Sequence, residues 1–196
     1  MAGCESCDSK PLANIVLFGM KHCGKSTIGA KLAERLGYTL FDLDDLMEVA
    51  YETRYGEYLS TREIFRQRGE EYFGNLEAEV AVELLNLLST EPDPAVVAVG
   101  GRAVLNERAR HVISHMGPRV YLKVNPDTLF ERVEAGGLPP FLDKDDPKGS
   151  FLALFEQRRP NYESFADVTV CLDDLSPEQS VDEILNALKE YGHARQ

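Results

Sequence analysis

The segment GMKHCGKST matches GxxxxGK[ST], the pattern of a loop that binds phosphate groups. Gly19 and Gly24 occupy the two glycine positions. In such a loop the backbone N–H groups point inward, and the following helix N-terminus adds a partial positive charge. We expect Lys25 to reach the β and γ phosphates and the Ser26 hydroxyl to ligate Mg²⁺, with Thr27 completing the pattern. The motif predicts binding of ATP with Mg²⁺.

Acidic residues follow the second predicted strand, in the segment FDLDD. Side-chain alternation along a strand would put Asp42 and Asp44 on one side, next to the phosphate loop. One of them could hold magnesium and the other orient an acceptor hydroxyl, whereas Asp45 could cap a helix. The segment VVAVGG carries no acid of the ATPase kind, and no NKxD motif of GTP switches occurs. These features favour a kinase.

Five short apolar runs alternate with longer segments of helical period. The runs are Asn14–Phe18, Thr39–Leu43, Val96–Val99, Val120–Val124 and Val168–Leu172. Continuous rather than alternating hydrophobicity is typical of strands buried on both faces of a parallel sheet. The sequence therefore predicts an α/β fold in three layers, with a five-stranded parallel sheet between helices.

Apolar spacing places three of the helices. One contains Ile28, Leu32 and Leu36, and the last one begins at Ser176-Pro177 with a Ser cap. The stripe of the long helix consists of Phe73, Leu76, Val80, Leu84 and Leu87.

Two stretches interrupt this alternation of strands and helices. The polar, aromatic-rich residues 47–69 separate the second strand from the long helix, and residues 134–157 contain Gly-Gly, Pro-Pro and a run of charges. Loops longer than about 12–15 residues in compact domains are usually functional or disordered. We interpret the first stretch as part of a helical acceptor-binding lobe, residues 45–76, and the second as a mobile lid.

The 196 residues carry a formal net charge of -12, which argues against sequence-independent binding of nucleic acid. No apolar run reaches the roughly 18 residues of a membrane-spanning helix, and the N-terminus does not resemble a secretion signal. Cys4 and Cys7 form a single CxxC without the second pair that zinc sites usually have. We expect a cytoplasmic protein with no membrane partner, whose residues 1–13 form a flexible tail.

The order of several segments resembles the shikimate kinase family. These segments are the phosphate loop, FDLDDLME, EIFRQRGEEYFGNLEAEV, VVAVGGRAVL, RVYLKVNPDTLFERV and QRRPNYESFADVTV. The resemblance implies a nucleoside-monophosphate-kinase-like fold over residues 14–192, a closing lid, and a monomer.

The resemblance also implies roles for individual residues. Asp42 would help to hold Mg²⁺, and Asp44 would bind the acceptor hydroxyl as a catalytic residue together with Lys25. Arg132 would lie against adenine, and Arg158 would bind the carboxylate of the acceptor.

The expected acceptor pocket departs from the family pattern. An arginine that grips the acceptor carboxylate in the family is Gly74 here, and the family's triple glycine is Gly100-Gly101-Arg102. The lid arginine of the family corresponds to Pro139, for which Lys144 or Lys148 could substitute. In the phosphate loop, His22 replaces a glycine.

Losing one arm of a carboxylate clamp removes roughly 1.5–3 kcal/mol of charged hydrogen bonding. We therefore expect an altered acceptor that keeps a carboxylate for Arg158 or Arg102, and an amino-bearing alcohol such as homoserine fits best. Shikimate itself is the alternative, and a gluconate or nucleoside-monophosphate kinase is less favoured. A non-catalytic ATP-binding protein is a further alternative.

Overall fold

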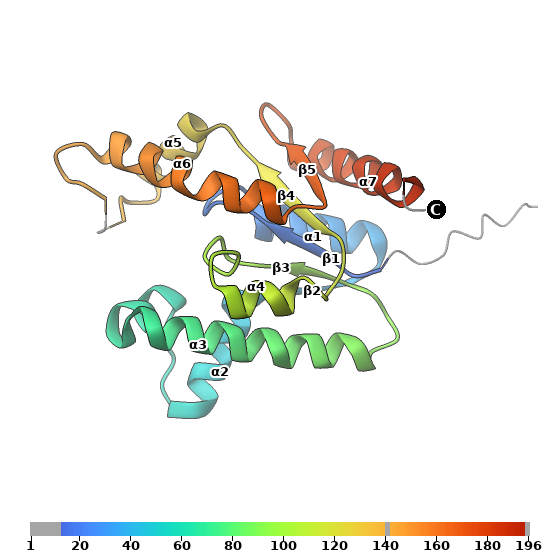
Figure 1. Cartoon of the computed structure of the whole chain (residues 1–196), viewed down its shortest axis with the longest axis horizontal. Helices are drawn as coiled ribbons and strands as arrows, with labels where there is room; N and C mark the ends of the chain where they lie inside the picture. Colours follow the sequence, from blue (N-terminus) through green and yellow to red (C-terminus); the bar gives the residue numbers. More distant parts are fainter. Residues whose placement is uncertain (1–12, 140–141, 195–196) are drawn as a thin grey trace, which may run out of the picture.

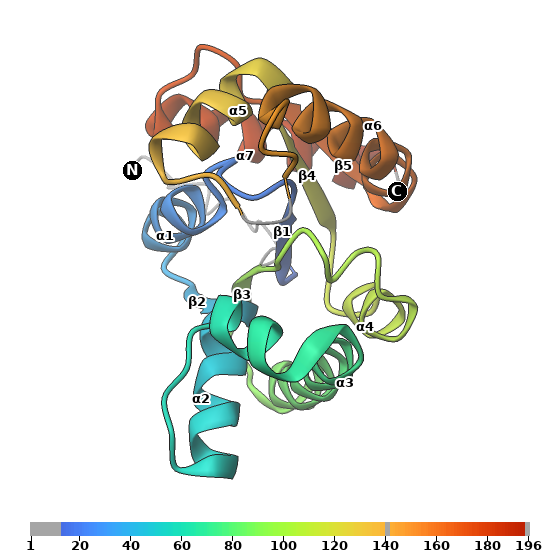
Figure 2. The ribbon, with the colours of Figure 1, turned by 90° about the vertical axis from the view of Figure 1, so that its left-hand side faces the viewer.

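A computed structural model describes residues 13–139 and 142–194 of the chain. It contains a five-stranded sheet in the order β2-β3-β1-β4-β5, and every strand pair is parallel. Helices cover both sides, with α1 and α4 on opposite faces (Figures 1 and 2). The strands are β1 (Ile15–Phe18), β2 (Thr39–Asp42), β3 (Ala95–Ala98), β4 (Arg119–Lys123) and β5 (Val168–Cys171). The predicted α/β architecture is confirmed.

Seven helices connect or flank the strands within the described residues. They are α1 (Lys25–Leu36), α2 (Leu43–Tyr55), α3 (Thr61–Thr90), α4 (Glu107–Ile113), α5 (Pro126–Ala135), α6 (Pro147–Phe165) and α7 (Pro177–His193). α1 and α7 contact each other, and α6 contacts β4 and α5. The carboxyl ends of parallel strands are where open α/β sheets bind ligands.

The central strands explain the continuous apolar runs. Every residue of β1 and of β3 is buried, because helices lie on both faces of the sheet. The outermost strands β2 and β5 are more exposed, and β2 has no fully buried residue. The core thus lies around β1, whose carboxyl end leads directly into the phosphate loop.

Local capping signals set two helix starts. Ser176 and Gln179 form a reciprocal capping box at α7, as the Ser-Pro sequence indicates, and Ser60 and Glu63 form another at α3. α3 therefore begins well before the apolar stripe that predicted it. Its first turns lie in the stretch that the sequence analysis separated from the long helix.

The geometry of α3 differs from the prediction in two respects. Gly69 has φ 82° and ψ 178°, a conformation that glycine adopts without a Cβ clash, and it breaks the helix into two parts. The predicted stripe residue Leu87 is 40% exposed, whereas Leu88 is buried. Steps of four from Leu76 through Leu84 reach Leu88, so the prediction of Leu87 in the core was wrong.

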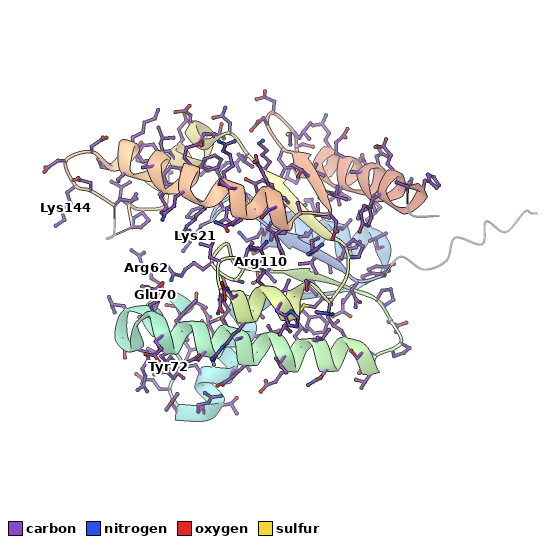
Figure 3. The ribbon with its side chains drawn as sticks, viewed as in Figure 1. Lys21, Arg62, Glu70, Tyr72, Arg110 and Lys144 are labelled. Carbon is purple, nitrogen blue, oxygen red and sulfur yellow. The ribbon has the colours of Figure 1, made fainter. Side chains whose placement is uncertain are left out.

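An aromatic cluster joins α2 to α3. The Arg68 guanidinium lies 4.5 Å from the Tyr55 ring centroid and 5.5 Å from that of Tyr51, and its Nε donates to the Tyr51 hydroxyl at 3.0 Å. The ring of Tyr72, labelled in Figure 3, packs at 6.2 Å from Tyr51. The attraction between an arginine and aromatic rings favours this geometry. The cluster thereby holds α2, whose first turn carries Asp44 and Asp45, against α3.

The segment expected to form a lid is partly helical. α5 ends at Ala135 and α6 begins at Pro147, with the Asp146 side chain accepting from the Gly149 N–H at 2.9 Å. The last part of residues 134–157 is therefore helix, because Pro147 after a capping Asp starts one. The Cys4 and Cys7 pair lies outside the described residues. No helix in the described ranges is long and apolar enough to span a membrane.

Candidate functional site

The phosphate loop connects β1 to α1, as its sequence predicts. The Lys25 ammonium group turns back over the loop and donates to the carbonyl oxygens of Gly19 at 3.2 Å and Met20 at 3.0 Å. Gly24 is the N-cap of α1 in a left-handed conformation, and no side chain caps this helix. The first N–H groups of α1 are thus left for an anion, which a helix N-terminus favours.

Two oxygen ligands suited to magnesium meet beside this loop. Ser26 Oγ donates to Asp42 Oδ2 at 2.8 Å, although the residues are 16 positions apart. Mg²⁺ is usually bound by one or two carboxylates together with substrate phosphates and water. No cluster of three or more His, Cys, Asp or Glu residues able to hold a metal occurs in the described part of the chain. The hydroxyl and carboxylate fit an ion shared with a nucleotide.

The relation between the two aspartates differs from the prediction. β2 ends at Asp42, and α2 begins at the next residue, so Asp44 lies in the first turn of a helix rather than on the strand. Alternation therefore does not place these two side chains, and that argument was wrong. Asp42 is itself a cap, because its Oδ1 accepts from the Asp44 N–H at 3.1 Å.

Asp44 is a partly buried carboxyl group at the end of the sheet. Burial, and next the negative charge of Asp42, raise the pKa of Asp44, while Lys25 and Lys21 oppose this shift. A Cβ placed on Gly100 would lie 3.0 Å from Asp44 Oδ1. The absence of a side chain at Gly100 therefore lets the carboxyl group approach the segment after β3.

Tyr162 ties this segment to the phosphate loop. Its hydroxyl donates to the Gly101 carbonyl oxygen at 3.0 Å and lies 3.4 Å from the Met20 sulfur. Burial raises the pKa of Tyr162 to about 12, against an opposing effect of Arg158. Tyr162 was not among the predicted site residues, although it stands in the segment QRRPNY, four residues after the predicted Arg158.

His22 and Arg132 lie on the other side of the phosphate loop. His22 has φ 66°, a left-handed conformation that explains why glycine suits this position. Burial and the charges of Lys21, Lys25 and Arg132 lower the pKa of His22. Arg132 Nη1 donates to the His22 carbonyl oxygen at 3.2 Å, so the structure places Arg132 against the loop.

A groove of about 750 Å³ lies between α3, α6 and the segment after β3. Its size is within the range typical of pockets for small molecules. Of the predicted site residues it brings together Arg102 and Arg158, whereas the residues of the phosphate loop lie outside it. The lining residues are Glu70, Glu71, Phe73, Gly74, Asn75, Glu77, Arg102, Leu105, Asn106, Glu107, Arg108, Leu154, Gln157, Arg158 and Asn161.

Glu77 is a buried carboxyl group in this groove that the sequence analysis missed. It is 2% exposed, and its Oε2 accepts from Asn106 Nδ2 at 3.1 Å. Burial raises the pKa of Glu77 to about 7, and Asp44 adds to the shift while Asn106 and Arg102 oppose it. A signal was present, because Glu77 follows Phe73 by four residues and so lies on the apolar face of the helix.

The two lysines considered as substitutes for a lid arginine are placed differently. Lys148 Nζ lies 2.7 Å from Asp127 Oδ1, an exposed ion pair between α6 and α5. Lys144 lies in the connection before α6, at the far end of the molecule in Figure 3. Neither lysine lines the groove.

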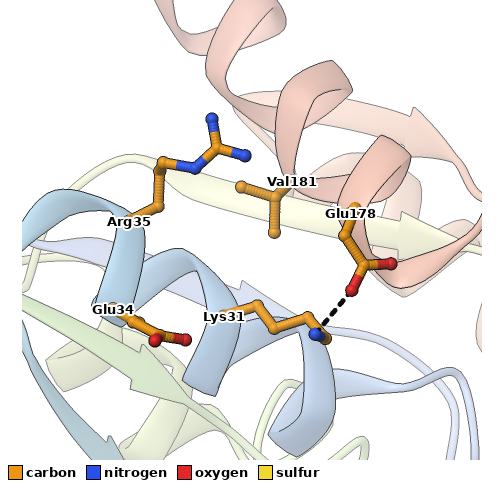
Figure 4. Close-up of a pocket in the computed structure, with 5 residues that line it drawn as sticks. All are labelled: Lys31, Glu34, Arg35, Glu178 and Val181. Atoms are coloured by element: carbon orange, nitrogen blue, oxygen red, sulfur yellow. Dashed lines mark hydrogen bonds and ion pairs between the residues drawn. The ribbon is translucent and has the colours of Figure 1, made fainter.

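A second depression lies between α1 and α7 (Figure 4). The Lys31 ammonium group lies 2.6 Å from a Glu178 carboxylate oxygen, and Arg35 lies 3.5 Å from Asp182. These side chains are 40–61% exposed, and such pairs contribute little to stability. None of the predicted site residues lines this depression.

A phosphate-binding loop between β1 and α1, an adjacent Ser–Asp pair and a groove at the same end of a parallel sheet define a P-loop kinase. The sequence model of the family described as shikimate kinase matches residues 21–189. Since this match covers most of the chain, the chain belongs to the shikimate kinase family.

Individual relatives agree with this assignment. The chain is 37% identical over 181 residues to a shikimate kinase of Symbiobacterium thermophilum, covering 91% of this chain and 98% of that protein. It is 39% identical over 185 residues to a shikimate kinase of Thermobifida fusca, covering 94% and 98%. The solved structure of shikimate kinase from Acinetobacter baumannii in complex with shikimate superposes with a TM-score of 0.77, at 27% identity, covering 91% of this chain and 94% of the other.

The family assignment establishes the class of reaction. The chain is a phosphotransferase that uses ATP with Mg²⁺ and transfers a phosphoryl group to an alcohol. The non-catalytic alternative raised by the sequence is not supported.

Proposed function

We propose that this kinase transfers the γ-phosphoryl group of ATP to a hydroxyl group of shikimate. The observation that carries the proposal is the juxtaposition of a phosphate loop, the Asp44 carboxyl group and an arginine-lined groove at one end of the sheet. The names of the similar proteins support the same acceptor, and one of them is bound to shikimate. An enzyme with this activity would act in the cytoplasm, in the biosynthesis of aromatic amino acids.

The nucleotide side of the site consists of the loop and its neighbours. Lys25 would leave the carbonyl groups that it now contacts and bind the β and γ phosphates. Ser26 and Asp42 would hold Mg²⁺, which when bound neutralises phosphate charge. Gly19, Gly24 and Thr27 contribute the backbone of the loop, and Arg132, beside the loop at His22, would flank the adenine.

The acceptor side consists of Asp44, the glycines after β3, and Arg158. Asp44 would orient the acceptor hydroxyl and accept its proton as the oxygen bonds to the γ phosphorus. The bond from that phosphorus to the β–γ bridging oxygen breaks, and ADP leaves. Arg158 would hold the acceptor carboxylate, while Gly100 and Gly101 let the acceptor approach closely. Closure of residues 45–76 and 134–157 would exclude water.

The hydroxy-amino acid expected from the sequence is the second candidate. Its one supporting observation is Glu77, a buried carboxyl group beside Gly74 that could pair with an ammonium group. The similar proteins lend homoserine no support, since those named above are shikimate kinases. Shikimate therefore has the stronger case.

A panel of acceptors tests the proposal. Release of ADP is measured with shikimate, homoserine and gluconate at equal concentrations, and the phosphorylated product is identified by mass and phosphorus NMR. We expect turnover with shikimate and only background hydrolysis with the other two. Turnover of homoserine without turnover of shikimate would reverse the assignment.

A further inference from the structure

The charges in the groove are unevenly placed. Among the described residues three arginines line it, of which Arg108 is exposed and donates from its Nη1 to Asn75 Oδ1 at 3.3 Å. Arg102 comes instead from the segment after β3, two residues beyond Gly100, which approaches Asp44. Of the groove arginines, Arg102 is therefore the one that belongs to the segment lying next to Asp44.

The guanidinium group of Arg102 contacts an aromatic ring and a carboxylate. Its Cζ lies 4.8 Å from the centroid of the Phe65 ring, and its Nη2 donates to Glu70 Oε1 at 2.5 Å. A guanidinium group has five N–H donors in a rigid fork. Within the described residues Glu70 is the only hydrogen-bond acceptor that Arg102 engages, so donors remain for a ligand.

The contact with Glu70 is easily exchanged. The side chains of Arg102 and Glu70 are 40% and 78% exposed, and exposed ion pairs contribute little to stability. Glu70 lies at the same end of the molecule as Lys21 of the phosphate loop (Figure 3). A ligand carboxylate that binds the guanidinium fork through two hydrogen bonds can therefore replace Glu70.

The groove also contains a buried carboxyl group that opposes the binding of an anion. Buried Glu77 lines the same groove, and when ionised it repels an entering carboxylate. Arg102 is close enough to Glu77 to lower its pKa against the effect of burial. Gly74 presents no side chain to the groove, so no other cation is supplied from that position of α3.

We propose that Arg102 is a second arginine, in addition to Arg158, that binds the acceptor carboxylate and so determines acceptor specificity, with Phe65 and Glu70 positioning its guanidinium group before the acceptor enters. The inference rests on the proposed function, because shikimate is taken as the acceptor. Arg102, in the segment after β3, would thus provide the contact with the acceptor carboxylate that Gly74 cannot make.

The test compares Arg102→Ala with Arg35→Ala, which removes an exposed arginine far from the groove. Calorimetry measures the Kd of shikimate, and the assay of ADP release measures KM for shikimate and for ATP. We expect Arg102→Ala to weaken shikimate binding by about 10- to 100-fold, with KM for ATP within about twofold of the wild type. Arg102→Lys should be intermediate, because lysine keeps the charge and loses the fork.

Two further measurements separate recognition from a general structural effect. The methyl ester of shikimate has no negative charge, so it should bind the wild type and Arg102→Ala with similar affinity. Adding Gly74→Arg to Arg102→Ala supplies a new guanidinium group to the groove and should recover part of the lost affinity.

The inference is overturned if Arg102→Ala changes the Kd of shikimate less than about twofold, if the ester suffers the same loss, or if the wild type does not bind shikimate. Shikimate binding that depends on Arg102 but leads to no ADP release would refute the proposed function alone.

Discussion

Ser26 Oγ donates to Asp42 Oδ2 at 2.8 Å, which joins the start of α1 to the end of β2. The hydroxyl belongs to the phosphate loop and the carboxylate to the neighbouring strand end, so the pair links nucleotide binding to the sheet. The same two oxygens are of the kind that Mg²⁺ prefers.

Ser26→Ala and Asp42→Asn should each lower kcat by about 100-fold, since metal clamping of a phosphoryl group is worth several kcal/mol. Half-saturation by Mg²⁺ should shift upward, and the double variant should lose less than the product of the two effects because both residues act on one ion. Titrations of activity with Mg²⁺ measure this. Ser89→Ala, an exposed helix serine bonded to Leu85, is the control. If the loss of kcat in the double variant equalled the product of the two single losses, the two residues would not act on one metal ion.

Asp44→Asn should lower kcat by about 10²- to 10⁴-fold if the carboxylate accepts the hydroxyl proton. Asp45→Asn removes an adjacent exposed carboxylate and should leave the rate nearly unchanged. The pKa of Asp44 is raised by burial and by Asp42, and activity needs the ionised form. The rate should therefore fall as the pH drops, with a midpoint above the ordinary pKa of about 4. A pH profile of kcat that is flat down to pH 4 would argue against this role.

Glu77→Gln should stabilise the protein at alkaline pH. Burial raises the pKa of Glu77 from 4.5 to about 7, so between these values the unfolded chain releases a proton that the folded chain keeps. The free energy of unfolding therefore decreases as the pH rises from 4.5 to 7, by about 3 kcal/mol at most. Denaturant titrations at pH 5 and pH 8 measure this, and Glu71→Gln, which removes an exposed carboxylate from the same helix, is the control. If the free energy of unfolding depended on pH equally in Glu77→Gln and in the wild type, a group other than Glu77 would cause the dependence.

Gly101→Ala should destabilise the junction between the phosphate loop and α6. A Cβ at this position would lie 2.8 Å from the Gly19 carbonyl oxygen and 2.8 Å from the Tyr162 hydroxyl. Overpacking of this kind costs about 1–3 kcal/mol, and the displaced loop should also bind ATP more weakly. Gly192→Ala is the control, since nothing lies within 4 Å of its Cβ. Thermal unfolding and ATP binding measure both effects, and an unchanged Tm in Gly101→Ala would contradict the close packing.

The structure also bears on the region where the sequence departs from the family pattern. Gly74 and Arg102 are 28 positions apart in the chain, yet both line one groove. The arginine that is missing at Gly74 and the arginine that is present at Arg102 can therefore act on the same ligand. The expectation of a homoserine-like acceptor already allowed for Arg102 as a carboxylate ligand, and it is the similar shikimate kinases that favour shikimate.

The sequence alone determined the parts of the protein whose physics is local. The phosphate loop follows from nine consecutive residues, the strands from short apolar runs, and the start of α7 from the Ser176 and Gln179 capping pair. In each case the backbone conformation depends on neighbours within about four residues, so spacing along the chain is sufficient.

The tertiary structure decided what depends on distant contacts. Asp42 is the last residue of β2 and Asp44 lies in the first turn of α2, so the two do not share one face of a strand. Glu77 is buried because α4 covers it and Asn106, 29 positions away, satisfies it. The Arg102 guanidinium contacts Phe65 and Glu70, which α3 brings to it from 37 and 32 positions earlier in the chain. Burial and charge pairing at such separations are set by the packing of whole elements, which no local periodicity encodes.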